Sequence, residues 1–409
     1  MQTVYNALIN LSGIVLKSAG FFSGKLQKFT EGRKELFPKL ENFCTHDQKR
    51  IWVHAASLGE FEMAVPVLKV LKEEFPDHQI VVSFFSPSGY ENKKKHQYVD
   101  FFTYLPLDTP HNAQQFLEIL APEMAIFVKY DFWPNFLLEL KRRKIRSFLI
   151  SGVFKSSQLF FQSYGKWMQK SLQAFEHFFV QDKRSAELLK QIGFTNCTVA
   201  GDNRFDRVAA QLEGSNSIDF IETFKNDRTL FVFGSSWPAD EALYIDFINK
   251  NPSTKFLIAP HEIHAEKIAR LESRLKLQTV KYSEMKPEYL AKSQVFILDT
   301  IGYLGKSYSY ADIAYVGGAA GNTGLHNVLE PATFGIPIIT GEHIQKFPEA
   351  LQLEKLAGLF KVSTASGFEK IAGKLLTDIE FRQKTGMISG HFINSNTGAT
   401  KIFQEYISL

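Results

Sequence analysis

A glutamate that could act as a general base follows the first strongly apolar segment after residue 50. The stretch HAASLGE ends at Glu60, and Gly59 would let a substrate come close to the backbone. A carboxylate in such a place can take the proton of an attacking hydroxyl. The same letters match the capping box S-x-x-E, in which Ser57 and Glu60 bind the first turn of a helix. The spacing alone favours capping, and His54 is equally compatible with a buried strand-end residue.

A second acid, Asp131, follows another apolar segment within KYDFWPN, residues 129–135. Pro134 suits the first position of a helix, which places Asp131 and Trp133 in the turn between a strand and that helix. The carboxylate could therefore face a site at the strand end. An N-cap aspartate beside a packed tryptophan explains the same letters, so this motif decides nothing on its own.

The stretch GSSWPADE, residues 234–241, is a candidate anion site. Ser235 and Ser236 supply hydroxyls, and the start of the following helix supplies backbone N–H groups that favour a phosphate. A plain connection between strand and helix is the alternative. The Walker pattern and the fingerprint G-x-G-x-x-G are both absent, so neither an ATPase nor a dinucleotide-dependent enzyme is indicated.

Histidine and glutamate gather in APHEIHAEKI, residues 259–268, and raise the question of a metal site. His261, Glu262 and His264 do not have the H-E-x-x-H spacing, and no further ligand set is evident. We therefore expect no metal.

The most specific stretch is YVGGAAGNTGLHNVLEPATFGIPIITGEH, residues 315–343. A glycine-rich loop follows a strand, and HNVLEPA then begins a helix that carries Glu330 in its first turns. A carboxylate there can accept hydrogen bonds from both hydroxyls of a ribose, and the helix N-terminus keeps it ionised. This pattern is typical of nucleotide-sugar binding.

The elements that must position these residues are short apolar strands alternating with helices. Uninterrupted apolar strands between helices indicate parallel sheets covered on both faces. The series runs once through the first half of the chain and restarts at TLFVFGSS, which predicts two doubly wound Rossmann-like domains divided near residues 205–228. In such folds ligands bind at the carboxyl ends of strands, where every motif above falls. The expected domains are 1–40, 41–210 and 211–409, with a C-terminal helix that crosses back.

Composition sets wider bounds. The 409 residues are 44% hydrophobic with a net charge of +4, which does not favour a nucleic-acid binder. Cys44 and Cys197 are far apart, so neither a disulfide framework nor a zinc site is indicated, and a reducing compartment fits.

The N-terminus is apolar from Val4 to Phe22 and carries one charge, at Lys17. Basic residues then follow at Lys25, Lys28, Arg33, Lys34 and Lys39. The pattern predicts an anchor on the cytoplasmic face of a membrane, either lying in the surface or spanning it briefly. A buried helix of the first domain is the alternative.

Several blocks in order resemble the Kdo (3-deoxy-D-manno-octulosonic acid) transferases, glycosyltransferases of the two-domain GT-B architecture. HAASLGE is similar to the family's H-A-x-S-x-G-E, whose glutamate is the base, and this implicates Glu60. KYDFWPN is similar to E-T-E-x-W-P-N, so Asp131 corresponds to the second acid. Lys129 stands where the family often has glutamate, which changes the local electrostatics.

Other blocks extend the resemblance over almost the whole chain. VAGDNRFDRV is similar to G-N-x-K-F-D, with Arg204 in place of the usual lysine. DTIGYL is similar to D-T-x-G-E-L, with Tyr303 in place of glutamate. HNVLEPA matches H-N-x-L-E-P-A closely.

The resemblance implies two Rossmann-like domains facing across a cleft behind an N-terminal apolar helix. It implies CMP-Kdo as co-substrate, a lipid A precursor (lipid IVA) as acceptor, inversion at the anomeric carbon, and neither metal nor cofactor. The implied catalytic residues are Glu60, Asp131 and Arg204, with Ser57 and Gly59 at the acceptor. The implied nucleotide-binding residues are Ser235, Ser236, Pro260, His261, Gly302, Tyr303, Leu304, Asn327, Val328, Leu329 and Glu330.

The implied location is the cytoplasmic side of the inner membrane. Two alternatives stay open. One is a related transferase that uses a UDP-sugar on the same fold. The other is a membrane-anchored nucleotide-sugar sensor without activity.

Overall fold

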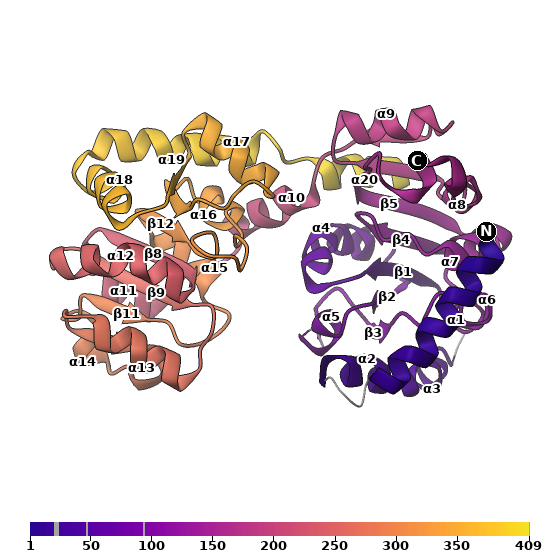
Figure 1. The fold of residues 1–409 in the computed structure, drawn as a ribbon, viewed down its shortest axis with the longest axis horizontal. Helices are drawn as coiled ribbons and strands as arrows, with labels where there is room; N and C mark the ends of the chain where they lie inside the picture. The colour runs from indigo at the N-terminus through magenta and orange to yellow at the C-terminus, as the bar shows by residue number, and fades with distance from the viewer. Residues whose placement is uncertain (20–23, 46–47, 93–94, 409) are drawn as a thin grey trace. The chain divides into compact units, whose positions relative to one another are not determined.

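The computed structural model describes residues 1–19, 24–45, 48–92 and 95–408. The chain divides into two compact units (Figure 1). Unit 1 comprises Met1–Arg207 and Thr397–Leu409, and unit 2 comprises Val208–Asn396. The last helix therefore belongs to the unit in which the chain begins.

Unit 1 is built on a parallel sheet in the order β3-β2-β1-β4-β5-β6-β7. Its strands are β1 (Arg50–Ala55), β2 (Gln79–Phe84), β3 (Phe101–Tyr104), β4 (Met124–Val128), β5 (Arg146–Gly152), β6 (His177–Val180) and β7 (Cys197–Val199). The central strands are buried on both faces, which is why they read as continuous apolar runs.

Helices cover both faces of this sheet. One apolar core joins the sheet to α3 (Leu36–Phe43), α6 (Pro110–Leu120), α7 (Pro134–Arg142), α8 (Lys166–Leu172) and α9 (Lys183–Gln191). The other joins it to α4 (Leu58–Glu74) and α20 (Ala399–Ile407). The remaining helices are α1 (Gln2–Ala19), α2 (Gly24–Lys34), α5 (Pro87–Asn92) and α10 (Asn203–Ala209), of which α10 spans the division between the units.

Local sequence signals begin several helices. Thr109, Asp182, Thr364 and Asp378 are N-caps whose side chains accept a hydrogen bond from a backbone N–H of the first turn. Each satisfies a donor that the helix itself leaves unpaired. α20 is held differently, because Asp206 accepts hydrogen bonds from the backbone at its start.

Unit 2 repeats the architecture with a parallel sheet in the order β10-β11-β9-β8-β12-β13-β14. Its strands are β8 (Leu230–Ser236), β9 (Lys255–Pro260), β10 (Thr279–Lys281), β11 (Val295–Ile297), β12 (Ile313–Val316), β13 (Ile338–Gly341) and β14 (Leu359–Val362). Its helices are α11 (Asp219–Lys225), α12 (Pro238–Lys250), α13 (Ala265–Arg274), α14 (Pro287–Leu290), α15 (Leu304–Ser307), α16 (Leu329–Thr333), α17 (Pro348–Leu356), α18 (Ala365–Thr377) and α19 (Ile379–Asn394).

The strand order places a switch point in each sheet, where successive connections run in opposite directions. In unit 1 it lies between β1 and β4, and in unit 2 between β8 and β12. Loops at the carboxyl ends of two such strands separate and leave room for a ligand. The prediction of two parallel α/β domains is confirmed, and β7, β10 and β14 are strands that the sequence pattern did not indicate.

Helix α1 exposes its apolar side chains. Val4, Leu8, Leu11 and Val15 are each more than half exposed and recur at helical spacing. The opposite side of α1 contacts unit 1, where the Tyr5 hydroxyl donates to Asp108 at 2.7 Å. The alternative of an apolar helix buried as core is therefore wrong for this stripe. The end of the predicted apolar run, residues 20–22, lies outside the described residues.

In the part of the chain that the structure describes, no helix has both the length and the apolar character needed to cross a membrane. Three of the basic residues that follow α1, Arg33, Lys34 and Lys39, contact other groups of unit 1. The Arg33 guanidinium lies 3.7 Å from the Phe29 ring centroid and donates to the backbone carbonyls of Phe29, Phe85 and Leu105. Burial lowers the pKa of Arg33 to about 9, so it stays charged at neutral pH. Lys34 and Lys39 pair with acids on neighbouring helical turns.

Candidate active site

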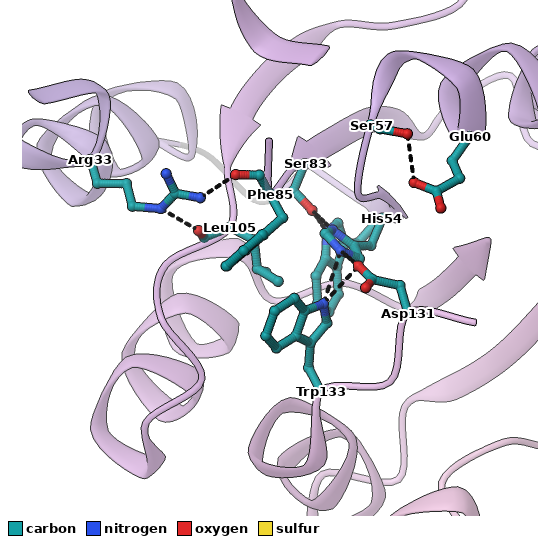
Figure 2. A network of polar contacts seen from close by, with 10 residues as sticks. Arg33, His54, Ser57, Glu60, Ser83, Phe85, Leu105, Asp131 and Trp133 are labelled. Carbon is teal, nitrogen blue, oxygen red and sulfur yellow. Dashed lines mark hydrogen bonds and ion pairs between the residues drawn. The ribbon is translucent and has the colours of Figure 1, made fainter. Parts of the chain in front are cut away.

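Glu60 lies just inside the start of α4, directly after β1. Its side chain is 7% exposed, and Ser57 Oγ donates to Glu60 Oε2 at 2.9 Å (Figure 2). Ser57 is the N-cap of α4 in extended backbone, but its side chain makes no capping hydrogen bond. The capping box that the spacing favoured is therefore wrong. The two side chains bind each other and leave one carboxylate oxygen, Oε1, for another partner.

The glycine before Glu60 leaves open space beside it. A Cβ built at Gly59 would meet Ser57 Oγ at 4.0 Å as its nearest described neighbour. Packing therefore does not require glycine at this position. The free volume is compatible with a substrate that approaches the backbone at the start of α4.

The surroundings of Glu60 favour a basic carboxylate. Burial raises the pKa of Glu60 above its ordinary value, and the Ser57 hydrogen bond lowers it. The negative charge on Asp131 raises this pKa again, while the positive charge on Lys129 lowers it. A carboxylate with a raised pKa is a stronger base, once ionised, than one in water. The lysine in place of the family's usual glutamate therefore offsets part of the shift.

Asp131 lies after β4, across the switch point from Glu60. Its Oδ2 is 2.5 Å from His54 Nε2 and accepts a hydrogen bond from Trp133 Nε1 at 2.8 Å (Figure 2). Lys129 begins this turn with a positive φ of 71°, a conformation that is uncommon outside glycine. The sequence pattern did not indicate that His54 and Trp133 would hold Asp131.

The alternative in which Asp131 caps α7 is also wrong, because the N-cap of α7 is Trp133. The first N–H groups of that helix, from Asn135 and Phe136, donate instead to the buried carboxylate of Asp108 at 3.1 Å. Burial raises the pKa of Asp108 to about 6, against the lowering effect of its hydrogen bonds with Tyr5 and the backbone. α1 and the start of α7 are thus joined through the carboxylate of Asp108.

Arg204 lies on α10 and forms an ion pair with Asp202. Its NH2 group is 2.8 Å from Asp202 Oδ2, and its backbone N–H donates to Asp202 Oδ1. The side chain is about one-third exposed. Arg204 belongs to unit 1, whereas the serines that were expected to share its role belong to unit 2.

In unit 2 the predicted serines are residues of β8 itself, which extends to Ser236. α12 begins only after Trp237, so the expected serine turn at a helix start is a strand end. The His261 backbone N–H donates to the Ser236 carbonyl at 2.9 Å. The His261 ring stacks on Trp237 with centroids 4.5 Å apart, and His326 lies 4.5 Å from His261 on centroids.

The glycine-rich loop after β12 is pinned to this strand end. The buried Asp240 carboxylate accepts hydrogen bonds from the Gly318 and Trp237 backbone N–H groups. A Cβ at Gly317 would come within 2.4 Å of the Ser235 carbonyl oxygen, so only glycine permits this approach. The structure thereby brings Ser235, Ser236, Pro260 and His261 to one edge of the sheet.

Glu330 lies in the first turn of α16, as the sequence predicted. Its Oε1 accepts a hydrogen bond from Asn327 Nδ2 at 3.1 Å. A Cβ at Gly305 would lie 3.9 Å from Glu330 Oε2, which places Glu330 beside the start of α15. The segments Gly302–Leu304 and Asn327–Glu330 therefore lie near each other at this end of unit 2.

Across residues 1–19, 24–45, 48–92 and 95–408, no three His, Cys, Asp or Glu side chains gather as a metal ion would require. Glu262, between His261 and His264, forms an ion pair with Lys267.

Comparison with known proteins identifies the family. A family model described as 3-Deoxy-D-manno-octulosonic-acid transferase (kdotransferase) matches residues 28–207. The 3-deoxy-D-manno-octulosonic acid transferase of Haemophilus influenzae is 29% identical over 408 residues, covering 94% of this chain and 93% of the relative. That of Chlamydia muridarum is 31% identical over 319 residues, covering 72% of this chain and 70% of the relative. The chain belongs to the Kdo transferase family.

Solved structures agree with the fold of this Kdo transferase family member. A UDP-GlcNAc 2-epimerase from Neisseria meningitidis bound to UDP-GlcNAc has a TM-score of 0.61 at 13% identity. The match covers 88% of this chain and 99% of the epimerase. At this identity the likeness concerns the fold alone, which is the two-domain architecture of GT-B glycosyltransferases.

Family membership makes the chain a glycosyltransferase. Four residues of the site, His54, Trp133, Trp237 and His326, were not among the residues predicted from the sequence. His54 and Trp133 lie inside the quoted motifs, and Trp237 and His326 do as well. The partners of His54 and Trp237 come from other strands and loops, so the motif letters gave no signal of these contacts. Trp133 donates within its own motif, to Asp131.

Proposed function

We propose that this glycosyltransferase moves Kdo from CMP-Kdo to lipid IVA, a lipid A precursor, in lipopolysaccharide biosynthesis. The observation that carries the proposal is the pair Glu60 and Asp131 at the switch point of unit 1. Glu60 is buried, has a raised pKa, and is held by one hydrogen bond from Ser57. A base in that state suits the removal of a proton from a sugar hydroxyl.

In the proposed reaction Glu60 takes the proton of the acceptor's primary hydroxyl as that oxygen attacks the anomeric carbon of Kdo. The attack displaces CMP from the opposite face, so the configuration at this carbon inverts. Gly59 and Ser57 would lie against the acceptor, because the space beside Gly59 is open. Asp131, with its Oδ2 held by two donors, would bind the acceptor through its other oxygen.

Unit 2 would bind the nucleotide of CMP-Kdo. Glu330 is proposed to accept hydrogen bonds from the ribose hydroxyls. The residues proposed to frame the CMP are Pro260, His261, Gly302, Tyr303, Leu304, Asn327, Val328 and Leu329. Ser235, Ser236 and Arg204 would stabilise the charge on the departing phosphate. We propose that these donors suffice, so that the reaction uses neither metal nor cofactor.

We further propose that α1 lies on the cytoplasmic face of the inner membrane. The support is its exposed stripe of Val4, Leu8, Leu11 and Val15, on the side opposite to the contacts with unit 1. Burial of such a stripe in the lipid interface stabilises binding by about 25 cal/mol for each Å² of apolar surface. Arg33 donates to backbone carbonyls of its own unit, so its charge would add little to any attraction by anionic lipid.

Point substitutions test the membrane proposal better than truncation, because removing α1 would also remove Tyr5 from the buried Asp108. Replacing Leu8 and Leu11 together by serine should sharply reduce co-sedimentation with vesicles of bacterial phospholipids. Ile301→Ser is the matched control, since Ile301 is 83% exposed in unit 2. Equal sedimentation of the double variant and the control would contradict the proposal.

Incubation with CMP-Kdo and lipid IVA, followed by mass spectrometry, tests the proposed reaction and counts the Kdo residues added. The expected product is lipid IVA heavier by one or more Kdo units. Transfer from a UDP-sugar in place of CMP-Kdo would favour the related transferase. CMP binding without any product would favour the sensor.

A further inference from the structure

A buried row of hydrogen bonds runs behind the proposed base in unit 1. Trp52 Nε1 donates to Ser83 Oγ at 2.8 Å, and Ser83 Oγ lies 2.8 Å from His54 Nδ1. The row continues from His54 Nε2 to Asp131 Oδ2 at 2.5 Å, and Trp133 Nε1 donates to the same oxygen (Figure 2). The first three residues are completely buried.

The sheet itself builds this row. His54 on β1 is the register partner of Ser83 on β2, and Trp52 lies two residues earlier on β1. Alternate residues of a strand point to the same face, so Trp52 and His54 flank the Ser83 hydroxyl on one side of the sheet. Rigid strands therefore hold three of the five side chains.

Counting protons along the row decides the state of His54. An indole N–H can only donate, so Ser83 Oγ must accept from Trp52 and has one proton left to give. Within the described part of the chain, His54 Nδ1 is the acceptor that lies within reach of that proton. His54 Nδ1 must then be unprotonated, which leaves the ring proton on Nε2, facing Asp131.

The other states of His54 fit poorly. A proton on Nδ1, in the second tautomer or the imidazolium, would leave the buried Ser83 hydroxyl proton without an acceptor. A bare Nε2 could accept from Trp133, which lies 3.1 Å away. It would then face Asp131 Oδ2 at 2.5 Å with no proton between two acceptors.

We propose that Trp52 and Ser83 are positioning residues that fix the Nε2-protonated tautomer of His54 and, through it, the orientation of Asp131 beside Glu60. This deepens the proposed function, on which it rests for the role of Asp131. Two donors on Oδ2 hold the carboxylate in one rotamer. In the described structure Oδ1 accepts no hydrogen bond, so that oxygen is presented to the acceptor sugar.

The direct test is 15N NMR of the full-length protein labelled at histidine, with the His54 signals assigned from their loss in His54→Gln. The wild-type protein should show an unprotonated, pyridine-like Nδ1 and a protonated, pyrrole-like Nε2. The opposite pattern, or a fully protonated ring, at neutral pH would overturn the proposal. This reading does not depend on catalysis.

Variants connect the tautomer to turnover. Ser83→Ala should remove the preference for an unprotonated Nδ1. It should lower kcat by about 10- to 100-fold, the range for groups that only orient the reacting ones. Trp52→Phe should do the same more weakly. His54→Gln, whose amide can donate to Asp131 and accept from Ser83, should keep more activity than His54→Phe. CMP affinity, which reports on unit 2, should not change in any of them.

Ser147→Ala is the matched control, because Ser147 is also fully buried on a strand of this sheet and its hydroxyl donates to the Ile145 backbone carbonyl. Loss of activity in Ser83→Ala without a change at His54 would reduce Ser83 to a packing residue and overturn the proposal. If Ser83→Ala does not fold, the Trp52→Phe variant and the wild-type spectrum decide whether the proposal stands. An active Glu60→Gln variant would instead defeat the proposed function and leave the tautomer intact.

Discussion

Replacing Glu60 by glutamine separates its proposed chemistry from its place in the fold. Glutamine has the same shape and keeps an oxygen that can accept the Ser57 hydroxyl, which now donates to Glu60 Oε2 at 2.9 Å. It cannot take a proton. We expect turnover to fall by at least about 100-fold, which is about 2.7 kcal/mol in the activation free energy.

At high pH the Glu60→Gln variant should be at least as stable as the wild-type protein, although its turnover is lower. Because burial raises the pKa of Glu60, its contribution to stability is present below the unfolded-state pKa and is lost as pH rises through the folded-state pKa. Ionised Glu60 therefore costs the folded state free energy. The variant should melt at or above the wild-type temperature at pH 8, with the difference shrinking towards pH 4.

The assay is single-turnover Kdo transfer to lipid IVA by mass spectrometry, with thermal melting of the same preparations. Glu73→Gln is the matched control, since Glu73 is an exposed glutamate on the same helix, and it should behave as wild type. Wild-type turnover in Glu60→Gln would refute the assignment of the base. Lost turnover with a much lower melting temperature would refute the claim that Glu60 is dispensable for folding.

Three further changes test other parts of the site. Glu330→Ala should weaken CMP binding by roughly 1.5–3 kcal/mol, as expected for a hydrogen bond to a charged group, and unchanged affinity by calorimetry would exclude ribose recognition. Asp131→Asn should shift the acid limb of kcat/KM to lower pH, because the charge on Asp131 adds to the effect of burial in raising the pKa of Glu60; a limb that does not move would count against this coupling. Asp108→Asn should gain stability relative to wild type by up to about 3 kcal/mol between pH 4 and 7.5, because burial raises the pKa of Asp108 to about 6. Urea unfolding at both pH values measures that difference, and a pH-independent difference would contradict it.

The amino-acid sequence was enough to predict the two parallel α/β domains and the strand ends that carry the motifs. Strands buried on both faces must be continuously apolar, and the helices between them must repeat their apolar residues at helical spacing. Both patterns can therefore be recognised in the sequence. Glu330 in the first turn of a helix was predicted in the same way, from a glycine-rich loop followed by HNVLEPA.

Which polar groups bind each other, by contrast, followed from the packing of the folded chain. The motif at Ser57 and Glu60 allowed a capping box, but the two side chains bond directly. The first N–H groups of α7 donate to Asp108 rather than to the nearby Asp131. Local spacing identifies groups that are able to bond, whereas the partner is set by strand order and by burial, which involve distant parts of the chain.

The placement of Glu60 and Asp131 at one switch point likewise depends on the fold. Their strands, β1 and β4, are not consecutive in the sequence and become neighbours because the sheet order reverses between them. The row from Trp52 to Asp131 likewise needs the register of β1 on β2. The sequence specified each residue and its strand end, and the packing of the sheet decided which of these ends meet, because register and strand order minimise the free energy of the whole domain rather than of any one segment.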